Sequence, residues 1–346
     1  MEPRLARPAA RPAAVPARVS APATRHWRLA LAALVAAGLA PGTWWRSTPP
    51  EPDYHAGLSV RAVTPSPQRL GPFALTGAWQ LTSANSHFGS WSAMLMQGDG
   101  RLLLASDRGR MLMMPPPGTP GESGMSYFAG QAEAIKARAD IEALTADRAT
   151  GRIWASFEGS NAVVRYEPGF RQTRTVQPPA MRGWSANSGP EAMARLADRR
   201  FIVLSEGRQR WTGSTAPALL FPGDPVTGVE PLRFLYTLDG DYRPVDMAAL
   251  PDGRVLVLER RVRLGLPPRF SSRLRLFDPQ QIAAGTPWQG DVLATIAGPL
   301  AENYEGLAVE PGAGGRLTLW LVSDDNNMRF QRTLLLRLEG AVPPAR

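Results

Sequence analysis

The feature that most constrains this chain is a repeat: five stretches of similar plan follow one another between residues 92 and 340. Each unit begins with a short apolar run, turns at a Gly- or Asp-containing sequence, and continues into a second apolar run that ends in an acidic residue. The first runs begin at Ser92, Glu142, Glu191, Asp246 and Glu305, so their starts lie 50, 49, 55 and 59 residues apart. The acids that end the second runs are Asp107, Glu158, Glu206, Glu259 and Asp324.

Apolar runs separated by such turns predict β-hairpins. Units of this length with about four strands each are typical of a β-propeller. One unit cannot bury both of its faces, so the units must stack into a ring. The last unit ends after its third strand, and residues 73–81, FALTGAWQL, are a spare strand that can complete it. We therefore predict an all-β fold: a propeller with five visible repeats, five or six blades, closed by an N-terminal strand.

Two alternatives to a five-bladed ring stay open. A sixth blade would draw on weak strands such as residues 58–63, which would otherwise dock onto the domain. A β-sandwich with Greek-key connections is the rival architecture, although regular acid-marked repeats argue against it. A helix of about two turns is expected at residues 132–139, AEAIKARA.

The first 72 residues differ in composition from the repeats. Residues 1–28 are rich in Pro, Ala and Arg and are expected to be disordered. Residues 29–45 are interpreted as a signal peptide or a signal anchor, because arginines precede the apolar run LALAALVAAGL. The run is shorter than the about 20 residues of a membrane span, but Pro41 disfavours cleavage. Residues 46–72 are interpreted as a Pro-rich tether and residues 73–340 as the propeller domain.

This organisation predicts a periplasmic or secreted protein, tethered to the inner membrane by residues 29–45 if the segment is not cleaved. Basic residues number 39 against 30 acidic ones, but much of the excess lies before residue 62. We therefore expect no nucleic-acid partner, because such binding needs basic residues clustered on one face. The absence of Cys excludes disulfides, thiolate catalysis and Cys-ligated zinc. We expect a monomer.

The acids of the repeat are the candidate functional residues. The first strand of each propeller blade lines the central channel, so Glu142, Glu191, Asp246 and Glu305 would converge on one mouth as metal ligands or catalytic bases. Crowded carboxylates repel one another, and such a cluster persists when it binds a cation or pairs with arginines. The candidate metal ligands are Asp107, Glu158, Glu206, Glu259, Asp324 and Asn326. Oxygen-only ligands favour a divalent cation, Ca²⁺ more than Mg²⁺. The alternative is structural: the acids cap turns and accept backbone N–H groups of the next blade.

With these motifs assembled, the chain resembles the bacterial phytase-like propeller family, whose description is "esterase-like activity of phytase". The resemblance covers about residues 58–340. The segments that carry it include Phe88-Gly-Ser-Trp-Ser-Ala, Asp140-Ile-Glu-Ala-Leu, Asn187-Ser-Gly-Pro-Glu-Ala192, Tyr242-Arg-Pro-Val-Asp246, Asn303-Tyr-Glu-Gly-Leu and Val322-Ser-Asp-Asp-Asn-Asn327. The residues before Ser92 and after Asn326 depart from the family pattern, close to the expected mouth.

The resemblance implies a hydrolase of ester bonds, phosphatase- or esterase-like, acting on a small anionic or ester substrate. Arg108, Arg208 and Arg260 would clamp anionic oxygens, or would each pair with a neighbouring acid. His87 is the one plausible general base for a serine hydrolase, but no Gly-x-Ser-x-Gly elbow exists. Whether the protein is an enzyme stays open. A non-catalytic propeller that binds a ligand or envelope partner, and a lactonase-like propeller, are the alternatives.

Overall fold

The computed structural model describes residues 27–36, 51–64, 69–128, 139–209, 213–265, 268–328 and 330–344. The chain divides into two compact units, Met1–Glu51 and Pro52–Arg346. In the first unit, residues 27–36 are helical. Among the described residues, no helix has the length and apolar character needed to cross a membrane. The helix expected at residues 132–139 falls outside the described residues, apart from Ala139.

The second unit contains five antiparallel sheets, which we call blades I to V. Blade I contains β4 (Trp91–Met96), β5 (Leu102–Ser106), β6 (Arg110–Met114) and β7 (Gly124–Tyr127). Blade II contains β8 (Ile141–Asp147), β9 (Arg152–Phe157), β10 (Ala162–Glu167) and β11 (Arg171–Val176). Blade III contains β12 (Pro190–Arg195), β13 (Phe201–Ser205), β14 (Thr215–Phe221), β15 (Leu232–Thr237) and the short parallel strand β19 (Pro287–Trp288).

Blade IV contains β16 (Arg243–Ala249), β17 (Val255–Arg263), β18 (Arg269–Phe277) and β20 (Gly290–Ile296). Blade V contains β21 (Asn303–Pro311), β22 (Leu317–Asp324), β23 (Thr333–Gly340) and β3 (Phe73–Thr82), with β1 (Ser59–Ala62) and β2 (Arg69–Leu70) paired to β3. Short 3-10 turns occur at η2 (Pro179–Met181), η3 (Pro225–Thr227), η4 (Pro279–Gln281), η5 (Gly298–Leu300) and η6 (Ala313–Gly315).

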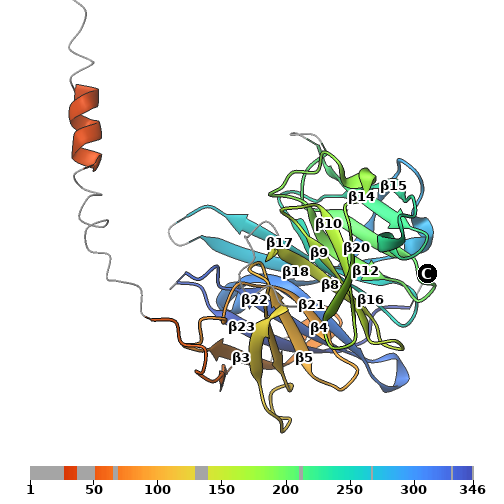
Figure 1. Ribbon diagram of the computed structural model, residues 1–346, viewed down its shortest axis with the longest axis horizontal. Coiled ribbons are helices and arrows are strands. Elements are labelled where there is room, and N and C mark those ends of the chain that lie inside the picture. The colour runs from red at the N-terminus through yellow and green to blue at the C-terminus, as the bar shows by residue number, and fades with distance from the viewer. Residues whose placement is uncertain are drawn as a thin grey trace, which may run out of the picture. The chain divides into compact units, whose positions relative to one another are not determined.

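The first strands of the five blades form a closed ring. β4 contacts β8, β8 contacts β12, β12 contacts β16, β16 contacts β21, and β21 returns to β4. Figure 1 shows these five strands gathered toward the middle of the second unit. The protein is therefore a five-bladed β-propeller, which confirms the predicted fold and removes both the sandwich and the sixth blade.

The ring is closed by pairing between the two ends of the domain. β3 pairs antiparallel with β23, from Phe73 opposite Gly340 to Leu81 opposite Thr333. This confirms that the spare N-terminal strand completes the last blade. β1 pairs with the outer edge of β3, so the strand at residues 58–63 docks on blade V.

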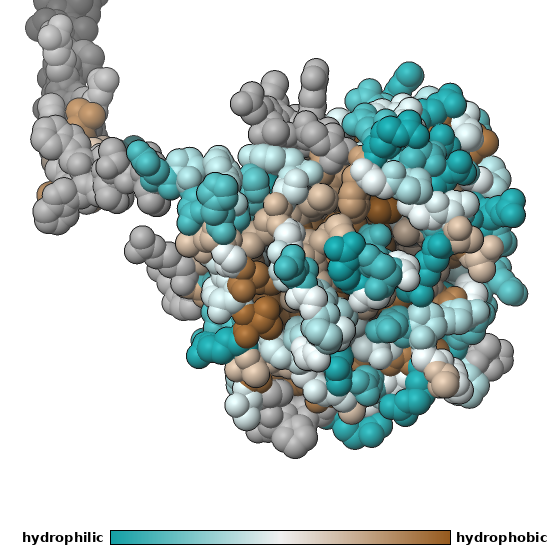
Figure 2. All heavy atoms as spheres, turned by 60° about the horizontal axis from the view of Figure 1, so that its bottom comes forward, coloured by the Kyte–Doolittle hydropathy of each residue, from teal (hydrophilic) through white to brown (hydrophobic). Residues whose placement is uncertain are grey.

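The hydrophobic core is divided among the interfaces between blades. One cluster joins blades I and V through Trp91, Met94 and Trp320, and another joins blades I and II through Leu103, Ile141 and Tyr166. Three further clusters fill the II–III, III–IV and IV–V interfaces in the same way. On the face shown in Figure 2, hydrophilic side chains prevail and hydrophobic ones form small patches. Each blade thus buries its apolar faces only against its neighbours, which is the physical reason for the ring.

The first strand of each blade, which we call the inner strand, contains a β-bulge near its start. These bulges position the side chains of the candidate site. The register against the second strand shifts by one residue, which leaves one inner-strand residue unpaired in each blade. The bulged residues are Ser92, Glu142, Glu191, Val245 and Glu305. Bulges re-aim side chains and recur beside functional sites.

The bulges correct the alignment of the fourth repeat by one residue. Matching the units by their acids had placed Asp246 with Glu142 and Glu259 with Glu158. The register instead makes Val245 the bulged residue and pairs Glu259 with Pro244, while Arg260, one residue further on, lies opposite Arg243. Arg260 therefore occupies the position that Asp107, Glu158, Glu206 and Asp324 hold in the other blades. Blade IV contributes a cation where its neighbours contribute acids.

Candidate functional site

The bulged residues and the second-strand ends meet at one mouth of the channel, because the two strands are antiparallel. Glu142 and Glu158 come from blade II, and Asp140 directly precedes the inner strand of that blade. Ligand oxygens of Asp140, Glu142 and Glu158 all lie within 4.8 Å of one another. Burial raises the pKa of Glu142 well above its ordinary value, and repulsion from Glu305 and Asp140 adds to the effect.

Glu191 continues the acidic cluster into blade III. Burial raises its pKa well above the ordinary value, followed by repulsion from Glu142 and Glu206. A hydrogen bond with the Glu158 carboxylate also raises the pKa of Glu191. Such a bond favours the protonated form of the Glu191 carboxyl group.

Blade V supplies Glu305 and Asp324. Burial raises the pKa of Glu305 to about 6, while Arg260 and the amide of Asn303 oppose this rise. Burial also raises the pKa of Asp324 to about 8, with Glu305 as the next cause. Asn303 Nδ2 donates to Glu305 Oε1 at 2.8 Å, and the backbone N–H of Asn326 donates to Asp324 Oδ1 at 2.7 Å. Both carboxyl groups are therefore held in fixed orientations.

Arg260 is the central cation of the cluster. Its Nη2 lies 3.3 Å from Glu206 Oε1 and its Nε lies 3.2 Å from Glu305 Oε1, so it bridges blades III and V. Burial alone would lower the pKa of Arg260, but Glu305 and Glu206 raise it. After the second strand of blade I, Arg108 Nε lies 3.9 Å from Asp107 Oδ1, and about half of the Arg108 side chain is exposed.

The donor set fits a hard divalent cation. Nine carboxyl groups of the described residues interact electrostatically in this cluster: Asp107, Asp140, Glu142, Glu158, Glu191, Glu206, Glu305, Asp324 and Asp325. Asn303 is 1% exposed, and its Oδ1 has no hydrogen-bond partner in the described part of the chain. An orphaned amide oxygen beside carboxylates adds the kind of ligand that Ca²⁺ accepts.

Asp246 and Glu259, the two acids misaligned in the sequence, have other environments. Asp246 is fully buried and accepts backbone N–H groups of Met247 at 2.8 Å and of Leu307 at 2.6 Å, with a further bond from Met94. The equivalent residues in the other blades are Ala93, Ala143, Ala192 and Gly306, whose small size leaves room for this one carboxylate. Asp246 thus joins the inner strands of blades IV, V and I.

Glu259 belongs to a closed ion network at the III–IV interface. Its Oε1 accepts from Tyr236 Oη at 2.7 Å and from Arg275 Nη1 at 3.1 Å. Its Oε2 accepts from Arg273 Nε. Because these partners saturate the fully buried carboxylate, it has no free oxygen to offer a metal ion.

Two further predicted residues lie outside the acidic cluster. The Asn326 side chain is exposed and donates to Gln331 Oε1 at 2.9 Å, so only its backbone touches the cluster. His87 packs between Tyr54 and Tyr127, at centroid distances of 4.7 and 4.4 Å. Burial and the charge of Arg110 lower the pKa of His87. It is therefore a neutral, aromatic-packed side chain at neutral pH.

Arg208, the third predicted anion clamp, lines a cavity of about 490 Å³ at the same mouth. Glu206 forms part of the wall of this cavity, so it adjoins the acidic cluster. The cavity also contains Arg243, which the sequence reasoning missed. Burial lowers the pKa of Arg243, and repulsion from Arg208 adds to this effect.

Two residues of the acidic cluster were also missed, although the sequence carries a signal for them. Asp140 and Asn303 each stand two residues before a bulged glutamate, in Asp140-Ile-Glu142 and Asn303-Tyr-Glu305. Side chains two apart in an extended chain lie on the same side. The polar-x-Glu spacing could therefore have identified both.

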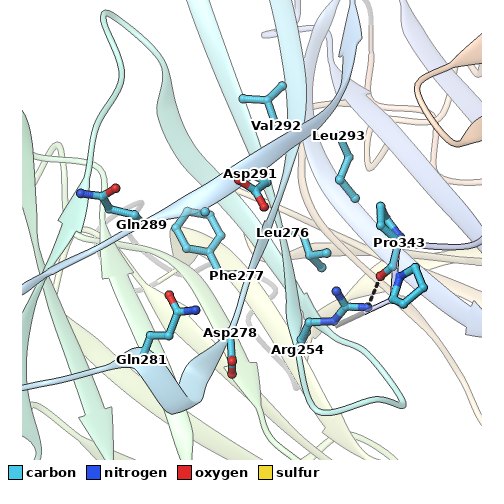
Figure 3. Close-up of a pocket in the computed structure, with 12 residues that line it drawn as sticks. Arg254, Leu276, Phe277, Asp278, Gln281, Gln289, Asp291, Val292, Leu293 and Pro343 are labelled. Carbon is cyan, nitrogen blue, oxygen red and sulfur yellow. Dashed lines mark hydrogen bonds between the residues drawn. The ribbon is translucent and has the colours of Figure 1, made fainter. Parts of the chain in front are cut away.

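A larger cavity, of about 610 Å³, lies at the opposite strand ends of blade IV (Figure 3). It is lined by Arg254, which is in the β16–β17 turn, and by Phe277, Asp291 and the C-terminal Pro343. Arg254 Nη2 donates to the Pro343 carbonyl oxygen at 2.6 Å and so holds the C-terminal segment in place (Figure 3). The acids of the repeat do not line this cavity, so the candidate site is the acidic mouth.

Residues 86–327 match the sequence model of the phytase-like family, described as "Esterase-like activity of phytase". No curated protein matches the chain. Among solved structures, a PQQ-bound aldose sugar dehydrogenase from Streptomyces coelicolor is 14% identical, with 83% of this chain and 99% of that chain covered and a TM-score of 0.43. A gluconolactonase from Xanthomonas campestris is also 14% identical, with 82% and 98% covered and a TM-score of 0.43.

Proposed function

The chain belongs to the phytase-like family, and from this premise we propose that it is an exported hydrolase of phosphoesters or other esters, assisted by a divalent cation. The observation that carries the proposal is the meeting of Asp140, Glu142 and Glu158 within 4.8 Å at the channel mouth. Ionising these groups together is costly in a buried site. A cation offsets that repulsion, and the donors are all oxygen atoms, which favours Ca²⁺ over softer metals.

Asp140, Glu142 and Glu158 would hold the cation, with Asn303 Oδ1 and Asp324 as further candidate ligands. When bound, the cation supplies Lewis-acid polarisation of a phosphoryl or carbonyl oxygen. Strongly shifted carboxyl pKa values in a cleft support a functional rather than a merely structural cluster. The pattern also explains why blade IV carries Arg260: its charge balances the acids that the cation does not contact.

Glu305 is the candidate general base. Its pKa of about 6 leaves it ionised at neutral pH and close to the value that favours proton transfer. Asn303 and Arg260 both engage its Oε1, which leaves Oε2 to accept a proton from an attacking water. Burial raises the pKa of Glu191 well above its ordinary value, which makes Glu191 the candidate group to give a proton to the leaving group.

The substrate proposed is a small ester or phosphoester with anionic oxygens. We propose export to the periplasm or the cell exterior, with residues 29–45 as the membrane tether if they are retained. Only part of that segment, through residue 36, is among the described residues. A fusion of residues 1–72 to a periplasm-dependent reporter would test this proposal, and a reporter that stays inactive would contradict it.

The proposed activity can be tested on protein freed of metal. Calorimetric titration with Ca²⁺ and Mg²⁺ should show binding, and turnover on a panel of aryl phosphoesters, carboxyesters and sugar lactones should require the cation. Glu142→Gln should weaken cation binding about 10-fold or more, because affinity follows ligand charge. Glu310→Gln is the matched control, since Glu310 is exposed on the inner strand of blade V, outside the cluster.

Each outcome of that panel identifies one function. Cation-dependent turnover of esters or phosphoesters supports the proposal. Cation binding without turnover would assign a non-catalytic binding propeller, and turnover of lactones alone would assign a lactonase-like enzyme. Equal cation affinity of Glu142→Gln and the wild type would refute the site itself.

A further inference from the structure

The cavity of about 490 Å³ beside Glu206 is built differently from the acidic cluster next to it. Two arginines, Arg208 and Arg243, line it together with Trp184 and the hydroxyls of Ser185 and Ser188. Glu206 is the one carboxylate among its lining residues, and it is already paired with Arg260 at 3.3 Å. The cavity therefore carries excess positive charge beside a strongly negative channel.

The two guanidinium groups are held close together by one carbonyl. Arg208 Nη2 donates to the Gly240 oxygen at 3.1 Å, and Arg243 Nη1 donates to the same oxygen at 3.3 Å. Arg208 is further fixed by the Gly213 carbonyl and by Asp241, whose side chain is 77% exposed. An ion pair that exposed is a weak compensation for a buried charge.

Arg243 keeps donors available for a ligand. Within the described residues, its hydrogen-bond acceptors are the carbonyls of Gly240 and Tyr242, and both engage Nη1. Nε and Nη2 thus form the free edge of a planar fork, a geometry that suits two oxygens of a phosphate or carboxylate. A purely structural arginine would use this edge on the protein.

We propose that this cavity is the anion subsite of the enzyme: Arg243, aided by Arg208, binds a phosphate or carboxylate group of the substrate while the ester bond to be cleaved lies over the acidic cluster. Glu206 lies between the two regions and, through Arg260, is connected to Glu305. Trp184 offers an aromatic wall for the part of the substrate that joins the two groups. The placement of the ester rests on the proposed hydrolase function, whereas anion binding by the cavity does not.

The direct test is anion binding by metal-free protein in calorimetry, with inorganic phosphate and acetate as separate probes. We expect saturable binding of at least one anion, and the tighter of the two identifies the group as phosphate- or carboxylate-like. Arg243→Gln should weaken binding about 10- to 100-fold, the usual range for a lost charge-assisted bond. Arg174→Gln, at an exposed position on β11, is the control with an equal change of charge.

A second variant covers the case in which Arg243→Gln fails to fold. Ser185→Glu places a carboxylate at the exposed wall of the cavity and removes no contact of either arginine. It should abolish anion binding and leave the unfolding temperature near that of the wild type. Undiminished anion binding by a folded Arg243→Gln or Ser185→Glu variant, or saturable binding of neither anion by the wild type, would overturn the proposal.

Kinetics separates this subsite from the hydrolase proposal. With cation added, Arg243→Gln should raise KM about 10-fold or more for an aryl ester that carries a free carboxylate group in addition to its ester bond. The KM change should be smaller for a neutral aryl acetate, which has no anionic group for Arg243 to bind. Anion binding without hydrolysis would preserve the subsite and reject the hydrolase. Hydrolysis with an equal KM change for both esters would reject the subsite alone.

Discussion

Arg260→Met offers a strong test of how the acidic cluster is stabilised. The variant keeps most of the side-chain volume but removes the charge that lies 3.3 Å from Glu206 and 3.2 Å from Glu305. Breaking a fully buried ion pair costs about 3 to 5 kcal/mol. The Arg260 side chain is 24% exposed, so water screens part of the loss. We expect a loss of about 2 to 3 kcal/mol in the free energy of unfolding at pH 8 without metal.

The same loss should shrink in acid. The pKa of Glu305 is about 6 in the folded protein, so at pH 5 its carboxyl group is largely protonated and gains little from a neighbouring cation. Removing Arg260 raises that pKa further. We therefore expect the variant to lie within about 1 kcal/mol of the wild type at pH 5. Ca²⁺ at pH 8 should restore stability more in the variant than in the wild type, because it replaces the missing charge.

Urea denaturation followed by circular dichroism at pH 5 and pH 8 measures both quantities. Arg152→Met is the control, because Arg152 pairs with Glu167 at 3.0 Å but is 43% exposed. Its loss should stay below about 1 kcal/mol at both pH values. An equal loss at pH 5 and pH 8 for Arg260→Met, or no loss at either, would refute the electrostatic account of the cluster.

Three further predictions concern the channel. The metal-free wild type should lose stability as pH rises from about 5 to about 8. Glu305 and Asp324, with pKa values of about 6 and about 8, bind protons more tightly in the folded than in the unfolded protein. Unfolding temperatures measured across this pH range test the prediction, and a rise with pH would contradict it. Asp246→Asn should lower the free energy of unfolding by about 2 kcal/mol, since an amide cannot accept N–H groups on both sides. It should change the Ca²⁺ affinity by no more than about 2-fold, and a large loss of affinity in calorimetry would show that Asp246 is a cation ligand. Gly306→Ala should lower the free energy of unfolding by about 1 to 3 kcal/mol, because the new Cβ would lie 2.6 Å from Val322 Cγ1 and 3.1 Å from Met94 Cβ. An unchanged midpoint of urea denaturation would show that the inner strands move apart easily.

Much of the architecture is readable from the sequence for a local reason. Hairpin strands pair with neighbours in the chain, so the alternation of apolar runs and turns is enough to define each blade. Ring closure could also be anticipated, because the last repeat lacks a fourth strand and residues 73–81 have no partner of their own. The fourth strand of blade I, β7, was not predicted because Gly124–Tyr127 is only four residues long, too short for its alternation of Met125 and Tyr127 to stand out.

The site was only partly readable. The repeat placed Glu142, Glu191 and Glu305 at equivalent positions, because each is a bulged residue followed by Ala or Gly and then by Leu or Met. In blade IV, by contrast, acids stand one residue away from the equivalent positions, and a one-residue shift moves a side chain to the other face of a strand. The register between β16 and β17, which the sequence does not show, decided that Asp246 joins the strands and that Glu259 joins an arginine network.

The sequence by itself thus determined a propeller with five visible repeats, the strand that closes the ring, and the presence of acids at the inner strand heads, because these depend on periodicity along the chain. The tertiary structure alone decided that the ring has five blades and not six, that Arg260 stands among those acids, and that Arg208 and Arg243 share a cavity. Those relations join different blades or depend on strand register. The energies of these interactions depend on burial and on charged groups that lie a few ångströms apart, and only the closed ring brings those groups that near to one another.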